Sequence, residues 1–155
     1  MTIQLTQKER TMLEDQKVHE EVCIQKYTNY AQQASDPQLI QLFNQYASQE
    51  QQHYNTINQL LQGQQPNTAA NQGVQQQAQP MQNQKLAGMI NQEDAALCTD
   101  MMMTEKFVSG SYDTGIFQTA NPQVRQALQH IQREEQHHGA GILNYMQQNG
   151  MNKPQ

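Results

Sequence analysis

The apolar residues between Pro122 and Met146 follow the spacing of a helix, with a polar interruption in the middle. They recur every three or four residues and so share one stripe of a helix: Val124, Leu128, Ile131, Ile142 and Tyr145. Glu135 and His138 occupy the two positions of this stripe where further apolar side chains are expected. A buried carboxylate without a partner is costly, and a metal ion is the partner that suits a carboxylate and an imidazole together.

The same pattern occurs earlier in the chain, between residues 36 and 61. Its stripe consists of Leu39, Phe43, Tyr46, Glu50, His53, Ile57 and Leu60, again with a Glu and a His three residues apart in the middle. An offset of 85 residues places Glu50 on Glu135, His53 on His138 and the Asp-Pro at 36–37 on the Asn-Pro at 121–122. The chain therefore contains an internal repeat.

The same offset identifies a further matched pair of residues upstream of each Glu-x-x-His motif. It places Glu20 on Glu105 and Tyr27 on Tyr112, and each Glu lies 30 residues before the Glu of its own motif. Glu20 shares a helical stripe with apolar residues, whereas the neighbouring Glu21 falls on a polar face, so we expect Glu20 to point inward. Each half thus supplies one lone Glu, one Tyr and one Glu-x-x-His.

These periodic segments predict an all-α protein of one domain spanning residues 1–155. We expect helices at about 6–34, 37–62, 85–118 and 122–147, with a capping box from Thr6 to Glu9 and caps at Asp36 and Asn121. The segment at about 63–84 is rich in Gln, Pro and Gly, and suits either a disordered linker or a long crossover. The repeat favours the crossover, because two helical hairpins related by a twofold axis would bring all four carboxylates and both imidazoles together.

Composition narrows the possible functions further. Charged residues make up 15% of the chain and the net charge is −5, so no basic surface for nucleic acid is expected. No apolar run is long enough for a membrane span, and no secretory segment opens the sequence, so we expect a soluble protein made in the cytoplasm. Cys23 and Cys98 do not match each other in the repeat, and we expect packed thiols in place of a disulfide.

The preferred interpretation is a centre of two Fe or Mn ions, because carboxylate oxygens mixed with imidazole suit these metals better than a zinc site rich in thiolates would. The predicted ligands are Glu20, Glu50, His53, Glu105, Glu135 and His138, with Glu50 and Glu135 as bridges. The alternative is a buried polar network of protonated carboxyls and neutral histidines. A third Glu-x-x-His pair, Glu134 with His137, lies one residue off the stripe and is interpreted as solvated helix surface.

This set of ligands resembles that of the ferritin-like di-iron and di-manganese carboxylate proteins, which place one inward Glu on each of two helices and Glu-x-x-His on each of the other two. The resemblance implies a ferritin-like four-helix bundle of two hairpins joined by a long crossover. The Tyr seven residues after each lone Glu is also similar to a feature of ferritins. It implies that Tyr27 and Tyr112 lie near the metals as hydrogen-bond donors or electron sources in an oxidase or peroxide-removing reaction.

Within that superfamily, the segment from Leu5 to Leu61 resembles the spore coat protein F family of endospore-forming bacteria. This resemblance implies a protein made in the mother cell and deposited in the spore coat, with other coat proteins as partners; a homodimer is also open. It implies no established reaction. A structural coat component in which the metals only stabilise the bundle is therefore the main alternative to an enzyme, and a ferritin-type iron store is another.

Overall fold

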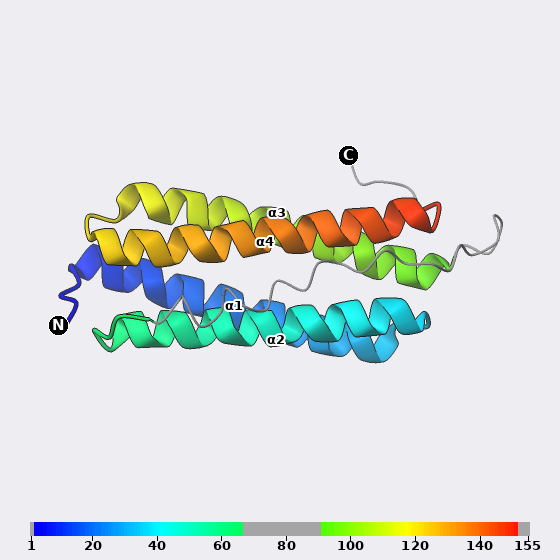
Figure 1. The fold of residues 1–155 in the computed structure, drawn as a ribbon, viewed down its shortest axis with the longest axis horizontal. Helices are drawn as coiled ribbons and strands as arrows, with labels where there is room; N and C mark the ends of the chain where they lie inside the picture. The colour runs from blue at the N-terminus through cyan, green and yellow to red at the C-terminus, as the bar shows by residue number, and fades with distance from the viewer. Residues whose placement is uncertain (1, 67–90, 152–155) are drawn as a thin grey trace.

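Four long helices form the protein in the computed structural model, which describes residues 2–66 and 91–151. They are α1 (Gln7–Gln33), α2 (Pro37–Leu61), α3 (Gln92–Gln118) and α4 (Pro122–Gln148). In sequence order they form two antiparallel hairpins, α1 with α2 and α3 with α4, which lie against each other along their length (Figure 1). The described part of the chain contains no strand, so the all-α four-helix bundle expected from the sequence is confirmed.

The helix ends follow from short capping motifs. Thr6 and Glu9 form the predicted capping box at the start of α1, where each side chain bonds the other's backbone N–H. Asp36 and Asn121 cap α2 and α4, and each is followed by a proline, which lacks the N–H that the first turn would leave unpaired. These three predicted caps are confirmed.

The start of α3 differs from the expected start near Lys85. The helix begins at Gln92, because the Asn91 side chain accepts a hydrogen bond from the Asp94 backbone N–H and so caps it there. Residues 67–90 lie outside the described part of the chain, as does most of the crossover expected at about 63–84. The end of α2 and the start of α3 lie at opposite ends of the bundle (Figure 1). This arrangement agrees with a connection between parallel helices α2 and α3 in place of a tight turn.

The apolar core consists of two clusters, one toward each end of the bundle. One includes Phe43 and Tyr46 of α2, Met101 of α3 and Ile142 of α4. The other includes Ile57 of α2, Val108 of α3, and Leu128 and Ile131 of α4. On all three helices the candidate ligands fall in the interval between the two clusters, so a buried polar layer separates them.

A second polar contact joins the hairpins near the turn between α1 and α2. The carboxylate of Asp94 at the start of α3 accepts hydrogen bonds from the backbone N–H groups of Ser35 and Asp36, at 2.9 and 3.0 Å. The hydroxyl of Tyr145 on α4 donates to Asp36 Oδ2 at 2.6 Å. These bonds attach the turn of the first hairpin to both helices of the second.

Two further observations concern the whole bundle. Cys23 and Cys98 are both buried as free thiols, one in each apolar cluster, as expected for packed thiols. Within residues 2–66 and 91–151, every helix is too short or too polar to cross a membrane.

Candidate metal centre

The six side chains predicted as metal ligands come together in the polar layer at the middle of the bundle. They are Glu20 on α1, Glu50 and His53 on α2, Glu105 on α3, and Glu135 and His138 on α4. Each is at most 2% exposed. The alternative inward residue on α1, Glu21, is exposed.

The six residues form two overlapping groups that could each hold a metal ion. One group is Glu20, Glu50, His53 and Glu135, and the other is Glu50, Glu105, Glu135 and His138. Within each group, one ligand atom from every residue lies within 4.8 Å of the others. Glu50 and Glu135 belong to both groups, which is the position expected of carboxylates that bridge two ions.

Buried ligand atoms without partners indicate that the cluster is suited to cations. Among the described residues, the atoms that form no hydrogen bond of good geometry include Glu20 Oε2, both Glu50 oxygens, Glu105 Oε2, Glu135 Oε2 and His138 Nδ1, and their nearest polar neighbours are other members of the same cluster. Leaving a buried polar atom unpaired costs about 1–3 kcal/mol, and more when the group is charged. Four carboxylates with two imidazoles are also the donor set that first-row divalent ions accept, and the charge of the carboxylates balances two such ions. The residues present therefore fit a pair of metal ions.

Burial and neighbouring charges favour the protonated form of two of the four carboxyls by raising their pKa values. Burial raises the pKa of Glu50 well above its usual range, and the charges of Glu20 and Glu105 raise it further. Burial likewise raises the pKa of Glu135, together with the charges of Glu50, Glu105 and Glu20. The raised pKa values thus fall on the two residues at the shared positions, so protons and a cation would compete for these carboxyls.

The other two carboxyls are stabilised in the ionised form. Burial raises the pKa of Glu20, but hydrogen bonds from Glu50, His53 and Tyr112 outweigh it and hold the pKa at about 2. Burial also raises the pKa of Glu105, and contacts with Glu135 and His138 outweigh it, so that this pKa is lowered too. The lone Glu of each half is therefore favoured as a carboxylate, the form that binds a metal ion.

The two predicted tyrosines connect the hairpins across the centre. Tyr27 on α1 donates a hydrogen bond to Glu105 Oε1 on α3, and Tyr112 on α3 donates to Glu20 Oε1 on α1 at 2.5 Å. Both tyrosines are fully buried, and burial beside these carboxylates raises the pKa of each well above its usual value. Each lone Glu is thus held by the Tyr of the other half, with the phenol kept protonated as the donor.

Both histidines turn Nδ1 toward the carboxylates and Nε2 away from them. His53 Nδ1 lies 3.0 Å from Glu135 Oε1, and His138 Nδ1 lies 2.8 Å from Glu50 Oε1. On the outer side, His53 Nε2 lies 3.1 Å from Glu134 Oε1, and His138 Nε2 lies 2.5 Å from Gln49 Oε1. The imidazoles are therefore oriented by partners outside the predicted ligand set, which is the usual arrangement around metal-binding histidines.

The interpretation of Glu134 as solvated surface is wrong. Its side chain is 20% exposed and contacts both His53 Nε2 and His130 Nε2, the latter at 2.8 Å. Burial raises the pKa of Glu134, but the contacts with His130 and His53 outweigh it and lower the pKa. The repeat contained a signal for this residue, because the 85-residue offset places Glu134 on Gln49. His137, the other member of that pair, is exposed as expected.

Gly141 makes room for an aromatic residue that packs against the centre. The Tyr46 ring stacks on His138, with 4.2 Å between ring centroids, and a Cβ added at Gly141 would lie only 1.9 Å from the Tyr46 hydroxyl oxygen. We expect Gly141→Ala to lower the free energy of unfolding by about 1–3 kcal/mol, because the packed ring cannot move aside without disturbing His138.

Gly139 on the same helix provides a matched control for that substitution. A Cβ added there would meet nothing within 4 Å, so Gly139→Ala is expected to stabilise the helix by up to about 1 kcal/mol. Urea denaturation of both variants measures the difference. Equal effects of the two substitutions would show that Tyr46 does not need the space at Gly141.

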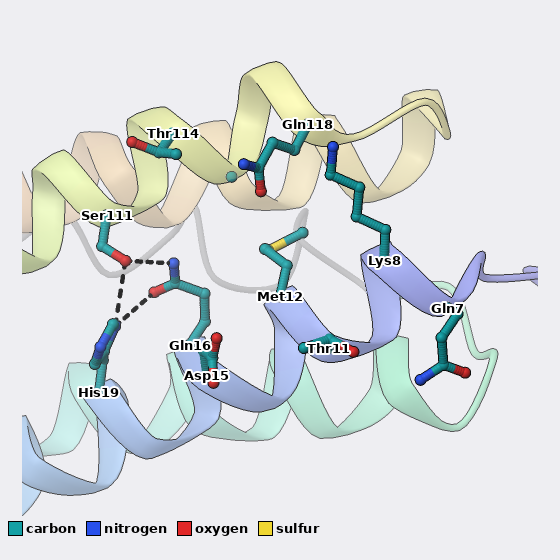
Figure 2. Close-up of a pocket in the computed structure, with 11 residues that line it drawn as sticks. Gln7, Lys8, Thr11, Met12, Asp15, Gln16, His19, Ser111, Thr114 and Gln118 are labelled. Atoms are coloured by element: carbon teal, nitrogen blue, oxygen red, sulfur yellow. Dashed lines mark hydrogen bonds between the residues drawn. The ribbon is translucent and has the colours of Figure 1, made fainter.

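A groove lies between the first half of α1 and the second half of α3 (Figure 2). It has a volume of about 670 Å³, and Gln16, His19 and Ser111 form a hydrogen-bonded network on its wall. Gln16 Nε2 donates to Ser111 Oγ at 2.7 Å, and His19 Nδ1 lies 3.1 Å from Gln16 Oε1. None of the six candidate ligands lines this groove, so it is separate from the cluster.

Comparison with known proteins supports one family. Residues 93–155 match the model of the Coat F domain, a segment that covers less than half of the chain and includes Glu105, Glu135 and His138. The earlier resemblance came from residues 5–61, so the match falls on the other half of the repeat. Searches of curated proteins and of solved structures found no match. The part of the chain that contains α3 and α4 is thus similar to the Coat F domain.

Proposed function

We propose that this chain is a spore coat protein whose ferritin-like bundle binds two iron or manganese ions between its two hairpins. The observation that carries the proposal is the pair of overlapping ligand groups that share Glu50 and Glu135. The unpartnered oxygens of the same buried residues support it, because they leave the cluster incomplete without cations. The Coat F match supports the location, and synthesis in the mother cell followed by deposition beside other coat proteins belongs to the same proposal.

Each ion would have a similar set of ligands. Glu20 and His53 would complete one position, and Glu105 and His138 would complete the other, with Glu50 and Glu135 serving both. Three carboxylates and one imidazole per ion favour iron or manganese over zinc in a structural site, which more often uses thiolates. Neither of the two ligand groups includes a cysteine.

Metal content measured by elemental analysis tests the proposal. Metal-free protein incubated with Fe(II) without oxygen, or with Mn(II), and then desalted is expected to retain about two ions per chain. The variant Glu21→Gln changes one exposed carboxylate beside Glu20 and should retain the same content. Wild-type protein that retains no more metal than the double variant Glu50→Gln/Glu135→Gln would refute the proposed function.

A second candidate function is a redox reaction at the same centre, and the positions of Tyr27 and Tyr112 favour it. Each phenol donates a hydrogen bond to a candidate ligand, so each lies next to the metal positions. Two iron or manganese ions would supply two electrons, which reduce hydrogen peroxide to two waters with uptake of two protons. The tyrosines would hold Glu105 and Glu20 in place and could deliver a proton or an electron from a buried position.

Peroxide consumption distinguishes this redox role from a purely structural one. Loaded protein with a redox role is expected to consume peroxide, and Tyr27→Phe/Tyr112→Phe should slow the reaction while leaving the metal content near two ions. Loaded protein that consumes no peroxide and oxidises no Fe(II) would leave the metals as stabilisers of the bundle alone.

A further inference from the structure

The two halves of the centre differ in the residue that contacts the outer nitrogen of each histidine. The 85-residue offset that relates Glu50 to Glu135 also relates Gln49 to Glu134. Each of these residues contacts the outer nitrogen of the other half's histidine: Glu134 contacts His53, and Gln49 contacts His138. The repeat therefore supplies a carboxylate in one place and a neutral amide in the other.

This difference affects the two imidazoles unequally. In both, Nδ1 faces the carboxylates of the centre, so the metal would bind Nδ1 while Nε2–H donates outward. An ionised acceptor forms a stronger hydrogen bond than a neutral one and makes the imidazole a stronger metal donor. His53, bonded to a carboxylate, should therefore hold its ion more firmly than His138, bonded to an amide.

The surroundings of Glu134 keep it in this role. His130, one turn earlier on α4, lies 2.8 Å from the same Oε1 that contacts His53, so the carboxylate is held between two imidazoles. The residue that matches His130 in the first half is Gln45, which again is an amide. Beside His53 the outer residues are therefore ionisable, namely Glu134 and His130. The matching residues beside His138, Gln49 and Gln45, are neutral amides.

The other ligands do not offset this difference. Glu50 and Glu135 serve both positions, and Glu20 and Glu105 are matched carboxylates that each accept a hydrogen bond from a tyrosine. The ligand carboxylates around the two histidines are thus equivalent in the repeat. The outer partners of the histidines, Glu134 and Gln49, differ in charge.

Given the proposed dinuclear centre, we propose that its two metal positions are unequal. The position formed by Glu20 and His53 binds its ion more tightly and fills first, and Glu134 is the positioning residue responsible. The position formed by Glu105 and His138 fills second.

Calorimetric titration of metal-free protein with Mn(II) tests the order. Wild type is expected to bind two ions in two steps whose dissociation constants differ by about 10-fold to 100-fold, the range typical for loss of such an outer partner. Glu134→Gln should weaken the first step by a similar factor and bring the two steps together. Gln49→Glu should strengthen the second step, which keeps the test decisive if the first variant folds poorly.

Three further variants complete the experiment. Glu21→Gln removes the same charge from an exposed position next to Glu20 and should leave both steps unchanged. With Glu105→Gln the tight step should survive, whereas Glu20→Gln should remove it. Electron paramagnetic resonance at one equivalent of Mn(II) should show isolated ions in wild type and coupled pairs only after the second equivalent.

The outcomes separate this inference from the proposed function. Two equal steps in wild type, or a Glu134→Gln variant with both steps unchanged, would overturn the unequal positions and leave the dinuclear centre standing. Absence of both Mn(II) and Fe(II) binding by folded wild type would overturn the centre itself, and the inference with it.

Discussion

Removing the metal from this protein is expected to lower its melting temperature by about 10 °C at pH 8. A ligand present at a thousand times its dissociation constant stabilises a fold by about 4 kcal/mol, and each kcal/mol corresponds to about 2–4 °C for a chain of this size. The loss should be large here because four buried carboxyls and two imidazoles remain together when the ions leave. Differential scanning calorimetry with and without a chelator measures it.

The fall in melting temperature on metal removal should be smaller at pH 6 than at pH 8. This pH dependence follows from the pKa shifts of the ligands. Burial lowers the pKa of His53, but contacts with Glu134 and Glu135 outweigh it and raise the pKa well above 6.5. Its protonation therefore stabilises the metal-free fold fully below about pH 6.5, and this contribution is lost as the pH rises through the raised pKa. The raised pKa values of Glu50 and Glu135 act in the same direction.

The remaining acids do not reverse this trend. The lowered pKa values of Glu20 and Glu105 give stability that is complete above their usual value of 4.5 and is lost only as the pH falls below it. Metal ions compete with protons for these ligands, so binding tightens as the pH rises. A melting temperature that chelation leaves unchanged at pH 8, or a difference that shrinks from pH 6 to pH 8, would contradict this prediction.

Glu135→Leu is expected to remove both ions and, at the same time, to make the metal-free protein more stable. Glu135 is completely buried and belongs to both ligand groups, so its loss affects both metal positions. The neighbouring carboxylates disfavour a charge on Glu135, and His53 keeps its contacts with Glu20, Glu50 and Glu134 when Glu135 is replaced, so an apolar side chain relieves a repulsion without leaving the imidazole unpaired. We therefore expect metal content to fall from about two ions to a small fraction of one, and the chelated variant to melt above chelated wild type.

The control for this substitution is Glu21→Leu, at an exposed position near the same layer. It should keep both ions and change stability little, since surface substitutions usually stay within about 0.5 kcal/mol. Elemental analysis and calorimetry of the two variants with and without chelator provide the comparison. A Glu135→Leu protein that still binds two ions would show that this carboxylate is not shared.

Much of the fold could be predicted because the repeat is visible in the spacing of a few residues. The Glu-x-x-His motifs interrupt apolar stripes on α2 and α4, and this interruption indicated both which face is inward and which residues meet there. The offset then identified Glu20 and Glu105 on helices whose own apolar patterns are weaker. The structure brings all six together in the interior.

The residues around the ligands were harder to predict, for a physical reason. Glu134 lies next to Glu135 in sequence and one position off the stripe, so periodicity alone assigns it to the surface. Its contact with His53 depends on how closely α2 and α4 approach each other, which spacing along one helix does not specify. The start of α3 was missed for a related reason, because the cap at Asn91 is a local hydrogen bond within a polar stretch without periodicity.

The exchanged bonds from Tyr27 to Glu105 and from Tyr112 to Glu20 have a mechanical consequence. Sliding one hairpin along the other by a single helical turn, about 5.4 Å, would pull both hydroxyls away from their acceptors at once. The two hydrogen bonds therefore fix the register of one hairpin against the other without any metal ion.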